Sequence, residues 1–532
     1  MSAPIALLSV SNKAGLADFA TALIHAGFRL LSTGGTSAAL RDAGLEVQDV
    51  SDHTGHPEIM GGRVKTLHPR IHGGVLGLRE PHAAEAAEHG ISWIDVVVVN
   101  LYPFEATVRA PGVTLEEAIE NIDIGGPTMV RAAAKNHAHV AVVTDPADYP
   151  ALAAELAAGG ISASTRAALA LKAFRHTACY DAVIAQWLAA HLDLPEDARQ
   201  RPAEGALPIR RAQTLRYGEN PHQRAVFYAD PGATGRALGR ARQLQGKELS
   251  FNNLADIDAA LRLAFDPQLA AALSPDGAAA VVIVKHHNPC GAAVHRRLPD
   301  AYRLALSADP VSAYGGVMAL SRPLDGETAR AIKASKVFYE VIAAPGVTDE
   351  AAAVLASREN LRVLALPEDW GQSLPSGDDA RRVMGGWLVQ DWDLGDPDPN
   401  SEWTLASARP PAADELPALR FAWAACSHVK SNAIVLARAE DGGLVLNGVG
   451  AGQMSRVDSV RIAISKATRP VKGSALASDA FFPFPDGVEL AVEAGVTALV
   501  QPGGSIRDAE VIGAVDRASA AMLLTGVRHF RH

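Results

Sequence analysis

Lys285 and His286 stand next to each other at the end of an apolar run, residues 278–284. A short run rich in β-branched residues predicts a buried strand, and the Asn-Pro and Gly within residues 288–291 predict that the strand breaks there. Strand ends are where α/β folds bind ligands. A lysine beside a histidine suits proton transfer, because a change of environment brings either pKa close to neutrality. The segment predicts a catalytic strand end, although an ordinary polar strand end followed by a turn has the same pattern.

A second group of polar residues follows the second predicted strand near the N-terminus. Ser32, Thr33, Gly34, Gly35 and Thr36 connect that strand to a predicted helix. Glycines let a ligand approach the backbone, and the amides at a helix start can hold a phosphate together with hydroxyl groups. We interpret the segment as a phosphate loop, but a plain strand-to-helix turn explains the same residues.

A basic segment favours an anionic ligand in the same region. Residues 63–70 contain Arg63, Lys65, Thr66 and a second arginine, and a pair of glycines flanks the segment on each side. Guanidinium and ammonium groups placed this closely suit a doubly charged phosphate. A solvated charged loop is the alternative for this segment alone.

Three further residues lie near predicted element ends and could exchange protons. Tyr102 follows a predicted buried strand at residues 94–99, and Asp123 precedes a predicted helix that carries Lys135. Pro127 suits the first position of that helix, because a proline there gives up no hydrogen bond. We expect Tyr102, Asp123 and Lys135 to converge, whereas each alone is more often an ordinary surface group.

These groups need a scaffold, and the spacing of apolar residues predicts one of the α/β class. Residues 4–11 and 28–31 have strand patterns, with apolar residues at helical spacing between them. Strands that alternate with helices predict a parallel, doubly wound sheet. A long alanine-rich helix ends this region, and residues 194–208 form the predicted linker. We therefore expect one domain at residues 1–198 and a second at residues 199–532.

The second predicted domain is large for a single core and contains a faint internal repeat. Residues 308–317 resemble residues 478–488, and a strand-like run precedes each of them, at residues 281–284 and 433–436. A duplicated α/β unit would explain this pattern, with residues 366–417 separating the copies. Chance similarity is the rival explanation.

Composition limits the class of protein. The chain has 532 residues, a net charge of −10 and 48% hydrophobic residues, which is typical of a globular protein of two or more domains. The acidic balance argues against nucleic acid or an anionic membrane as the main partner. The N-terminus lacks the basic flank of a signal peptide, no apolar stretch is long enough to span a bilayer, and three scattered cysteines give no disulfide framework. We expect a cytoplasmic protein.

Taken together, the motifs resemble those of the bifunctional enzymes that join 5-aminoimidazole-4-carboxamide ribonucleotide (AICAR) formyltransferase to inosine monophosphate (IMP) cyclohydrolase. They occur in the family's order and span nearly the whole chain. The resemblance rests on residues 32–36, 63–69, 100–104, 122–137, 216–223, 285–291, 450–456 and 478–486.

The resemblance implies an α/β protein with a methylglyoxal-synthase-like N-terminal domain that closes the purine ring. It also implies a C-terminal formyltransferase domain of two cytidine-deaminase-like units. The implied ligands are AICAR, formyl-AICAR and the co-substrate 10-formyltetrahydrofolate, and the implied assembly is a homodimer. Cytidine deaminases hold zinc through a Pro-Cys-x-x-Cys pair. Here Pro289 and Cys290 are followed by Gly291-Ala292-Ala293, with no second cysteine at the required spacing, so no catalytic metal is expected. Tyr314 departs from the family pattern, which usually has phenylalanine.

The resemblance further implies roles for individual residues in formyl transfer. His286 is the expected general base, and Lys285 is expected to stabilise the developing charge or to protonate the leaving nitrogen. Asn432 is the expected donor to the formyl oxygen. Glu340 is expected to reach across to the partner's site. Residues 528–532 are expected to fold back toward the site, whereas a basic tail that frays is the ordinary alternative.

For ring closure, the expected proton carriers are Lys135, Tyr102 and Asp123. Two rival functions stay open: the N-terminal domain alone could be a methylglyoxal-forming lyase, or the chain could be a non-catalytic purine-nucleotide sensor. The expected substrate-binding residues are Ser11, Lys13, Ser32, Thr33, Gly34, Gly35, Thr36, Arg63, Lys65 and Thr66 in the first domain, and Arg216, Tyr217, Gly315, Glu340, Arg456, Phe481, Asp486, Arg528 and His532 in the second.

Overall fold

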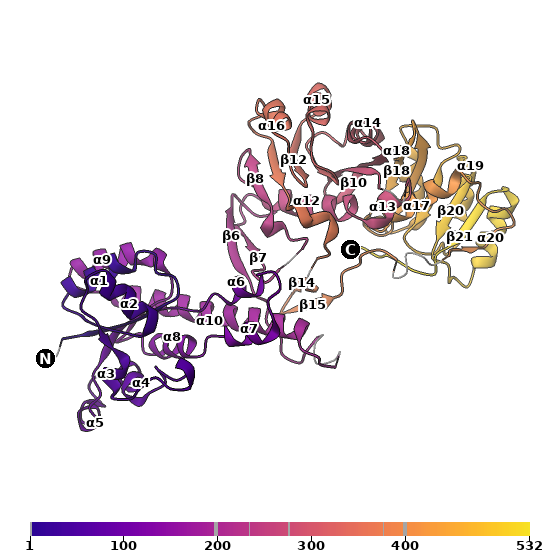
Figure 1. The fold of residues 1–532 in the computed structure, drawn as a ribbon. Coiled ribbons are helices and arrows are strands. Elements are labelled where there is room, and N and C mark those ends of the chain that lie inside the picture. The colour runs from indigo at the N-terminus through magenta and orange to yellow at the C-terminus, as the bar shows by residue number, and fades with distance from the viewer. Residues whose placement is uncertain (1–2, 196–200, 234, 275–276, 376, 397–401) are drawn as a thin grey trace. The chain divides into compact units, whose positions relative to one another are not determined.

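The chain forms two compact units, called unit 1 and unit 2 below (Figure 1). The predicted boundary between residues 198 and 199 falls among residues 196–200, outside the described residues. Unit 1 comprises residues 1–210 and 230–232, and unit 2 comprises residues 211–229 and 233–532. The computed structural model describes residues 3–195, 201–233, 235–274, 277–375, 377–396 and 402–532. Within these ranges, none of the helices combines the length and apolar composition of a membrane span.

Unit 1 is built on a five-stranded parallel sheet with helices on both faces, which confirms the predicted doubly wound fold. The central strands are almost entirely apolar and buried, as expected for parallel strands that are covered on both sides. Helices α1 and α9 pack together, and α8 packs against α4 and α10 (Figure 1). The strand order is β3 (Gln48–Asp49), β2 (Arg29–Ser32), β1 (Ile5–Val10), β4 (Ile94–Asn100) and β5 (Ala141–Val143), and the main helices are α1 (Leu16–His25), α2 (Gly34–Asp42), α4 (Pro69–Leu76), α8 (Gly125–Lys135), α9 (Tyr149–Ala157) and α10 (Ala163–His191).

The start of α8 differs from the sequence prediction. Pro127 is the third residue of this helix and not the first, because the helix begins at Gly125. The Asp123 carboxylate accepts a hydrogen bond from the Gly126 amide at 2.8 Å, so an aspartate satisfies one of the free amides at the helix start. The helix therefore begins directly beside Asp123.

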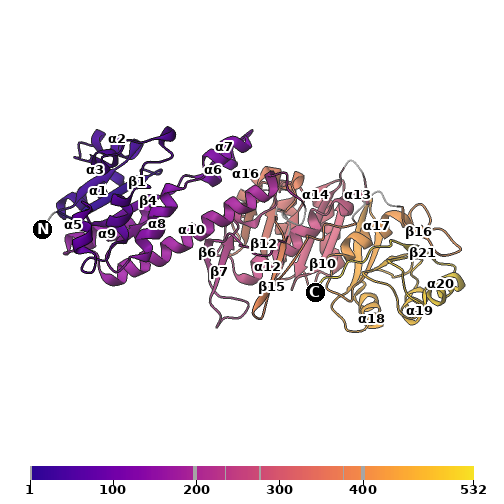
Figure 2. The same cartoon turned by 90° about the horizontal axis from the view of Figure 1, so that it is seen from below.

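Unit 2 contains one twelve-stranded sheet in which the same succession of elements occurs twice, which confirms the predicted duplication. The copies meet where β10 pairs with β18 in antiparallel fashion, and both lie in one continuous sheet (Figure 2). The first copy consists of β8 (Arg242–Gln245), α12 (Phe251–Ala264), β9 (Ala279–Lys285), β10 (Asn288–His295), α14 (Leu298–Ala308), β11 (Gly316–Leu320), α15 (Gly326–Ala334), β12 (Tyr339–Ala344), α16 (Asp349–Leu355) and β13 (Arg362–Ala365). The second copy consists of β16 (Thr404–Leu405), α17 (Glu415–Cys426), β17 (Ile434–Glu440), β18 (Gly443–Gly450), α18 (Arg456–Lys466), β19 (Ala475–Ser478), α19 (Asp486–Glu493), β20 (Ala498–Gln501), α20 (Asp508–Arg517) and β21 (Ala521–Leu524).

The two segments that suggested the repeat do not occupy equivalent places in it. Residues 308–317 run from the last residue of α14 into β11, so they lead into the fourth strand of the first copy. Residues 478–488 begin at the last residue of β19 and enter α19, so they follow the fourth strand of the second copy. The duplication was predicted correctly, but the proposed alignment of these segments was wrong.

Candidate active sites

The turn between β9 and β10 presents His286. Lys285 pairs with Asn288 across the hairpin, so His286 and His287 form a two-residue loop, with φ angles of 52° and 65°. The left-handed region is unfavourable for residues with a Cβ, and residues strained in this way often cluster at functional sites. The prediction that the strand breaks at Asn-Pro was wrong: the chain turns at the two histidines and resumes pairing at Asn288.

Side chains on both sides of this turn hold it in place. The His287 amide donates to Asp256 Oδ1 at 2.8 Å. The Asn288 side-chain amide donates to the His286 carbonyl at 3.1 Å, and its Oδ1 accepts from the Lys430 amide at 3.0 Å. Asn288 therefore joins the turn of the first copy to the segment that precedes β17 in the second copy.

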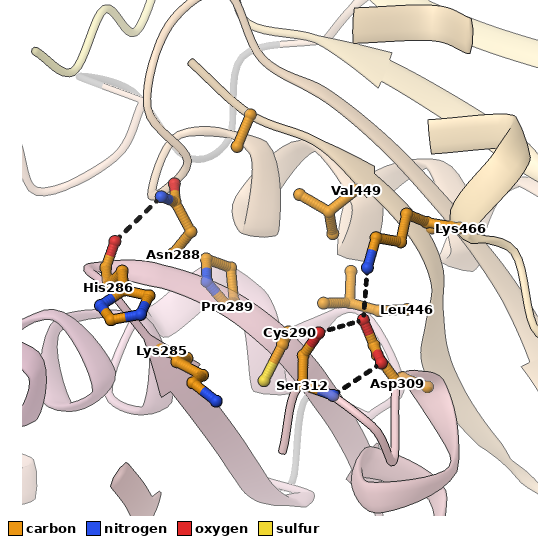
Figure 3. Close-up of a pocket in the computed structure, with 13 residues that line it drawn as sticks. Lys285, His286, Asn288, Pro289, Cys290, Asp309, Ser312, Leu446, Val449 and Lys466 are labelled. Carbon is orange, nitrogen blue, oxygen red and sulfur yellow. Dashed lines mark hydrogen bonds and ion pairs between the residues drawn. The ribbon is translucent and has the colours of Figure 1, made fainter. Parts of the chain in front are cut away.

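A pocket of about 200 Å³ lies beside the turn, between the two copies. Figure 3 shows Lys285 and His286 on one side of it and Asp309 with Lys466 on the other, with Cys290 between them. Lys285 Nζ donates to the Tyr314 carbonyl at 2.8 Å, and Lys466 Nζ lies 3.4 Å from Asp309 Oδ2. Burial raises the pKa of the Cys290 thiol to about 12, so this thiol is neutral. The pocket thus offers two ammonium groups, of Lys285 and Lys466, and the imidazole of His286 to a ligand.

Asn432 lies in a polar network on the second copy. Its side-chain nitrogen donates to the Gln453 carbonyl at 2.9 Å and the Met454 carbonyl at 3.2 Å. Its oxygen accepts from Arg456 at 2.7 Å, and Arg456 also pairs with the buried Asp479. The Asn432 amide is therefore engaged on all sides, and it must exchange one of these bonds to donate to a formyl oxygen.

The C-terminal tail is anchored to the same region. The Ser431 amide donates to the Arg531 carbonyl at 2.9 Å, which fixes the tail beside the segment that carries Asn432. Arg528 lies over the Phe530 ring at 4.3 Å, and the His532 carbonyl is 3.4 Å from Arg381 Nη1. The tail is bound, so the alternative of a frayed solvated end does not describe it.

The other predicted binding residues of unit 2 lie at more scattered positions. Arg216 stacks on the Tyr217 ring at 4.8 Å, and no described contact joins this pair to the pocket. Glu340 pairs with the buried Arg362 at 2.7 Å within the same chain. Gly315, with φ 74°, follows Tyr314, whose carbonyl binds Lys285. Two further predicted residues are exposed, Phe481 after β19 and Asp486 at the start of α19.

The second candidate site lies at the carboxyl ends of β1, β2 and β4 in unit 1. The strand order reverses between β1 and β4, and ligands of open α/β sheets bind at such a reversal. Ser11 Oγ lies 2.9 Å from Asn100 Oδ1 and 2.8 Å from the Leu101 carbonyl oxygen, and Asn100 Oδ1 accepts from the Asn12 amide at 2.8 Å. Asn100 was absent from the predicted site list, although its place at a strand end was a usable signal.

Only part of the predicted phosphate loop faces outward. The hydroxyl groups of Ser32 and Thr36 are buried and bind backbone groups of β1 at 2.8 and 3.0 Å. The exposed Gly34 and Gly35 begin α2, and a Cβ added at Gly35 would lie 4.0 Å from Lys13 Nζ. The ammonium group of Lys13 therefore stands near the positive end of the α2 dipole, an arrangement that favours an anion.

The predicted proton carriers of unit 1 do not all converge. Asp123 Oδ2 accepts from the Tyr102 amide at 3.3 Å. Burial raises the pKa of Asp123, against the opposing effects of the Gly126 and Tyr102 amides and the charge of Lys65. Lys135 is the last residue of α8, so at 1.5 Å per residue it lies roughly 15 Å along the helix from Asp123. The position of Lys135 at the far end of α8 sets it apart from Asp123, and the charge of Lys65 lowers the pKa of Asp123. A role for Lys135 in ring closure stays a prediction.

Two neighbouring residues complete this region. Thr66 is buried, and a Cβ added at Gly125 would lie 2.9 Å from its Oγ1, so Thr66 packs against the start of α8. Arg63 is exposed and forms an ion pair with Glu120. Across the described ranges, no group of three or more His, Cys, Asp or Glu residues is arranged to hold a metal ion.

Comparison with known proteins identifies relatives over the whole chain. A family model described as the AICARFT/IMPCHase bienzyme matches residues 133–466, and one described as the MGS-like domain matches residues 15–128. The protein named Bifunctional purine biosynthesis protein PurH in Myxococcus xanthus (strain DK1622) is 51% identical over 99% of this chain and 100% of its own length. The protein of the same name in Synechococcus sp. (strain CC9311) is 51% identical over 100% of both chains.

A solved structure also shares sequence with part of the chain. The crystal structure of ForH is 42% identical and covers 34% of this chain and 95% of its own. The TM-score is 0.32, which is too low for a comparison of the folds.

Proposed function

The chain belongs to the AICARFT/IMPCHase bienzyme family, and on that premise we propose where each of its two reactions takes place. It is a bifunctional enzyme of purine biosynthesis, a formyltransferase that uses a folate-derived formyl donor and a cyclohydrolase that forms IMP. Formyl transfer occurs at the pocket beside His286, and ring closure occurs at the carboxyl ends of the strands of unit 1. Similarity over the full length argues against both rivals, a lyase of the N-terminal domain alone and a non-catalytic sensor.

The observation that carries the first assignment is the strained turn that directs His286 to a polar pocket. The AICAR amine is conjugated with the carboxamide through the ring, so it is a poor nucleophile that must lose a proton as it attacks. His286 accepts that proton while the nitrogen bonds to the formyl carbon. Lys285 stabilises the developing oxyanion or protonates the folate nitrogen, so that the formyl carbon–nitrogen bond of the donor breaks with neutral folate as the leaving group.

The second copy contributes positioning and charge to the same reaction. Arg456 and Asn432 are held together by a hydrogen bond of 2.7 Å, and Asp479 orients Arg456 from the buried side. Asn432 can reach a formyl oxygen by giving up one of its two carbonyl partners. Arg528 and His532 then lie on the side of the site where the tail is bound, and Phe481 and Asp486 contribute to the folate side.

In unit 1, the carboxamide nitrogen attacks the formyl carbon and the formyl oxygen leaves as water. Holding the two groups in contact supplies much of the acceleration, because an amide nitrogen is weakly nucleophilic. Asp123, with its raised pKa, and Lys65 are placed to exchange the protons, with Tyr102 beside them. Lys13 and the first amides of α2 bind the phosphate, and Ser11 and Asn100 order the loop after β1.

The finer features of the function are also proposals. The formyl donor is 10-formyltetrahydrofolate, no catalytic metal takes part, and the enzyme is a cytoplasmic homodimer in which Glu340 contributes to the partner's site. Supplying AICAR and 10-formyltetrahydrofolate to the purified protein should yield IMP, and exhaustive treatment with a zinc chelator should leave the rate unchanged. Loss of the rate on chelation, restored by added zinc, would overturn the metal-free mechanism.

A further inference from the structure

A buried histidine in the C-terminal tail has carboxylates on both ring nitrogens. His529 Nδ1 lies 2.9 Å from Asp393 Oδ2, and Nε2 lies 3.0 Å from Asp396 Oδ1. The side chain of His529 is only 4% exposed, and its ring packs edge-on against Trp423 at 5.4 Å. Asp396 is equally buried and also accepts from the Trp423 indole at 3.0 Å. This clamp joins the end of the chain to the segment between the two copies.

The hydrogen bonds fix the protonation state of this histidine. An ionised carboxylate only accepts hydrogen bonds, so both ring nitrogens must donate and His529 must be an imidazolium. Burial opposes the charge, but the bonds to Asp393 and Asp396 outweigh it and raise the pKa of His529 to about 9. The same carboxylates have lowered pKa values, for the reciprocal reason.

A second buried histidine that contacts the tail, His428, is neutral. His428 Nδ1 lies 3.1 Å from Arg531 Nη1, and its Nε2 lies 2.9 Å from Asp266 Oδ2. Because a guanidinium only donates, Nδ1 must accept, and His428 is the neutral tautomer with its proton on Nε2. Burial lowers the pKa of His428 accordingly. Of the two histidines that hold the tail, only His529 carries charge at neutral pH.

Hydrogen bonds connect the clamp to the groups assigned to formyl transfer. The His529 amide donates to the Asp479 carbonyl at 3.3 Å, and the carboxylate of Asp479 binds Arg456. Two residues further on, the Arg531 carbonyl accepts from the Ser431 amide, next to Asn432. Figure 2 shows the C-terminus beside the middle of the twelve-stranded sheet, far from β21 where the last strand ends. A tail that crosses this distance needs an anchor.

We propose that His529, as an imidazolium held between Asp393 and Asp396, is a positioning residue for formyl transfer. It fixes the C-terminal tail against Asp479 and Ser431, and so fixes Arg456 and Asn432, which the proposed function assigns to formyl transfer. The proposal rests on the assignment of formyl transfer to this pocket. His529 itself makes no contact with the reacting atoms.

The test compares His529→Gln with the unchanged enzyme across pH. Glutamine keeps a donor but carries no charge, so formyl transfer should fall on the order of tenfold at pH 7, since charge-assisted hydrogen bonds are lost. Cyclisation of supplied formyl-AICAR should stay unchanged. In the unchanged enzyme, the contribution of His529 is complete below its ordinary pKa of 6.5 and is lost as the pH rises through about 9. A decline of formyl transfer near that pH should therefore be present in the unchanged enzyme and absent in His529→Gln.

Controls separate the clamp from general damage and from the site assignment. His295 is the last residue of β10, at the end away from the His286 turn, and its Nδ1 lies 3.8 Å from Asp300 Oδ2. The control variant His295→Gln should leave formyl transfer unchanged. Asp396→Asn weakens the clamp without altering the sequence of the tail, and it should lower the pH at which formyl transfer declines. If His529→Gln does not fold, this variant tests the proposal in its place. The proposal would be overturned if folded His529→Gln and folded Asp396→Asn both transferred formyl groups at the full rate at all pH values. It would also be overturned if these variants lost formyl transfer and cyclisation equally. Full formyl transfer by Lys285→Ala would instead overturn the site assignment on which it rests.

Discussion

The two copies in unit 2 build the same hairpin with different turn residues. In the second copy, Glu440 pairs with Gly443, and the loop between them is Asp441-Gly442, with φ angles of 48° and 77°. Asp-Gly is the sequence that such two-residue turns prefer, because both positions need a positive φ. The first copy has the same left-handed pair made of His286 and His287. The Asp441-Gly442 turn has residues that adopt a positive φ easily, whereas the His286-His287 turn has residues that can take part in chemistry.

Unit 1 reaches its chemistry by a different route. Its candidate groups come from segments that are far apart in sequence, such as Ser11, Lys65 and Asp123, and the parallel sheet brings them to one edge. In unit 2 the duplicated fold places two neighbouring residues on one turn and completes the site from the other copy. A strained local motif is therefore the stronger guide to the site in unit 2, and topology is the stronger guide in unit 1.

The largest effect is expected from variants at the His286 turn of the first copy. Lys285→Ala or His286→Ala should reduce formyl transfer by roughly a hundred- to ten-thousand-fold, the usual contribution of a positioned general base. Cyclisation of supplied formyl-AICAR should continue at the normal rate, because its proposed site lies in unit 1. Both rates are measured on the same preparation of folded protein. Equal loss of both activities would contradict the separation of the two sites.

The next largest effect is expected at the proposed ring-closure site of unit 1. Asp123→Asn or Lys65→Met should slow ring closure by about a hundredfold, since each removes a group placed to move a proton. Lys135→Ala should leave ring closure near normal, because Lys135 lies at the far end of α8. Formyl transfer in the same variants serves as the control. A large loss of ring closure in Lys135→Ala, with Lys65→Met active, would show that the sequence grouping was right and the geometric one wrong.

Several features could be predicted from the sequence because they depend on local patterns. Continuous apolar runs identified β4 and β9, and the alternation of strands and helices identified the parallel sheet of unit 1. The motifs also identified the family. The turn at His286 and His287 was missed because sequence rules expect glycine or asparagine at left-handed positions, and the following Asn-Pro drew the predicted break.

Other features depend on distances that no local pattern contains. The start of α8 at Gly125 and its straight rise separate Lys135 from Asp123, whereas Lys65 approaches from another loop. The clamp around His529 joins residues more than 130 positions apart, so it could not be predicted from spacing. The repeat was recognisable, but its alignment was not, because the two similar segments lie on opposite sides of equivalent strands, one before β11 and the other after β19.

A smaller effect is expected at Asn288, which links the two copies. Asn288→Ala removes one bond to the His286 carbonyl and one from the Lys430 amide, at 3.1 and 3.0 Å. Formyl transfer should fall about tenfold, as two hydrogen bonds of modest net strength are lost. Asn288→Asp keeps the acceptor for Lys430 and should lose less. An unchanged rate in Asn288→Ala would show that the turn is held well enough by Asp256 alone.

The smallest expected effect is on stability. It is tested by exchanging one residue between the two turns. His287→Gly removes a left-handed residue with a Cβ, which costs roughly 1–2 kcal/mol, and the greater freedom of glycine in the unfolded chain offsets part of the gain. The melting temperature should rise slightly while formyl transfer is retained, because His287 does not line the pocket described above. Gly442→His is the reciprocal change: a Cβ there would meet only His295 Nε2, at 3.7 Å, so strain and not crowding should lower the melting temperature. If both variants melt at the temperature of the unchanged protein, the His-His turn is not strained. Its residues would then say nothing about which copy carries the chemistry.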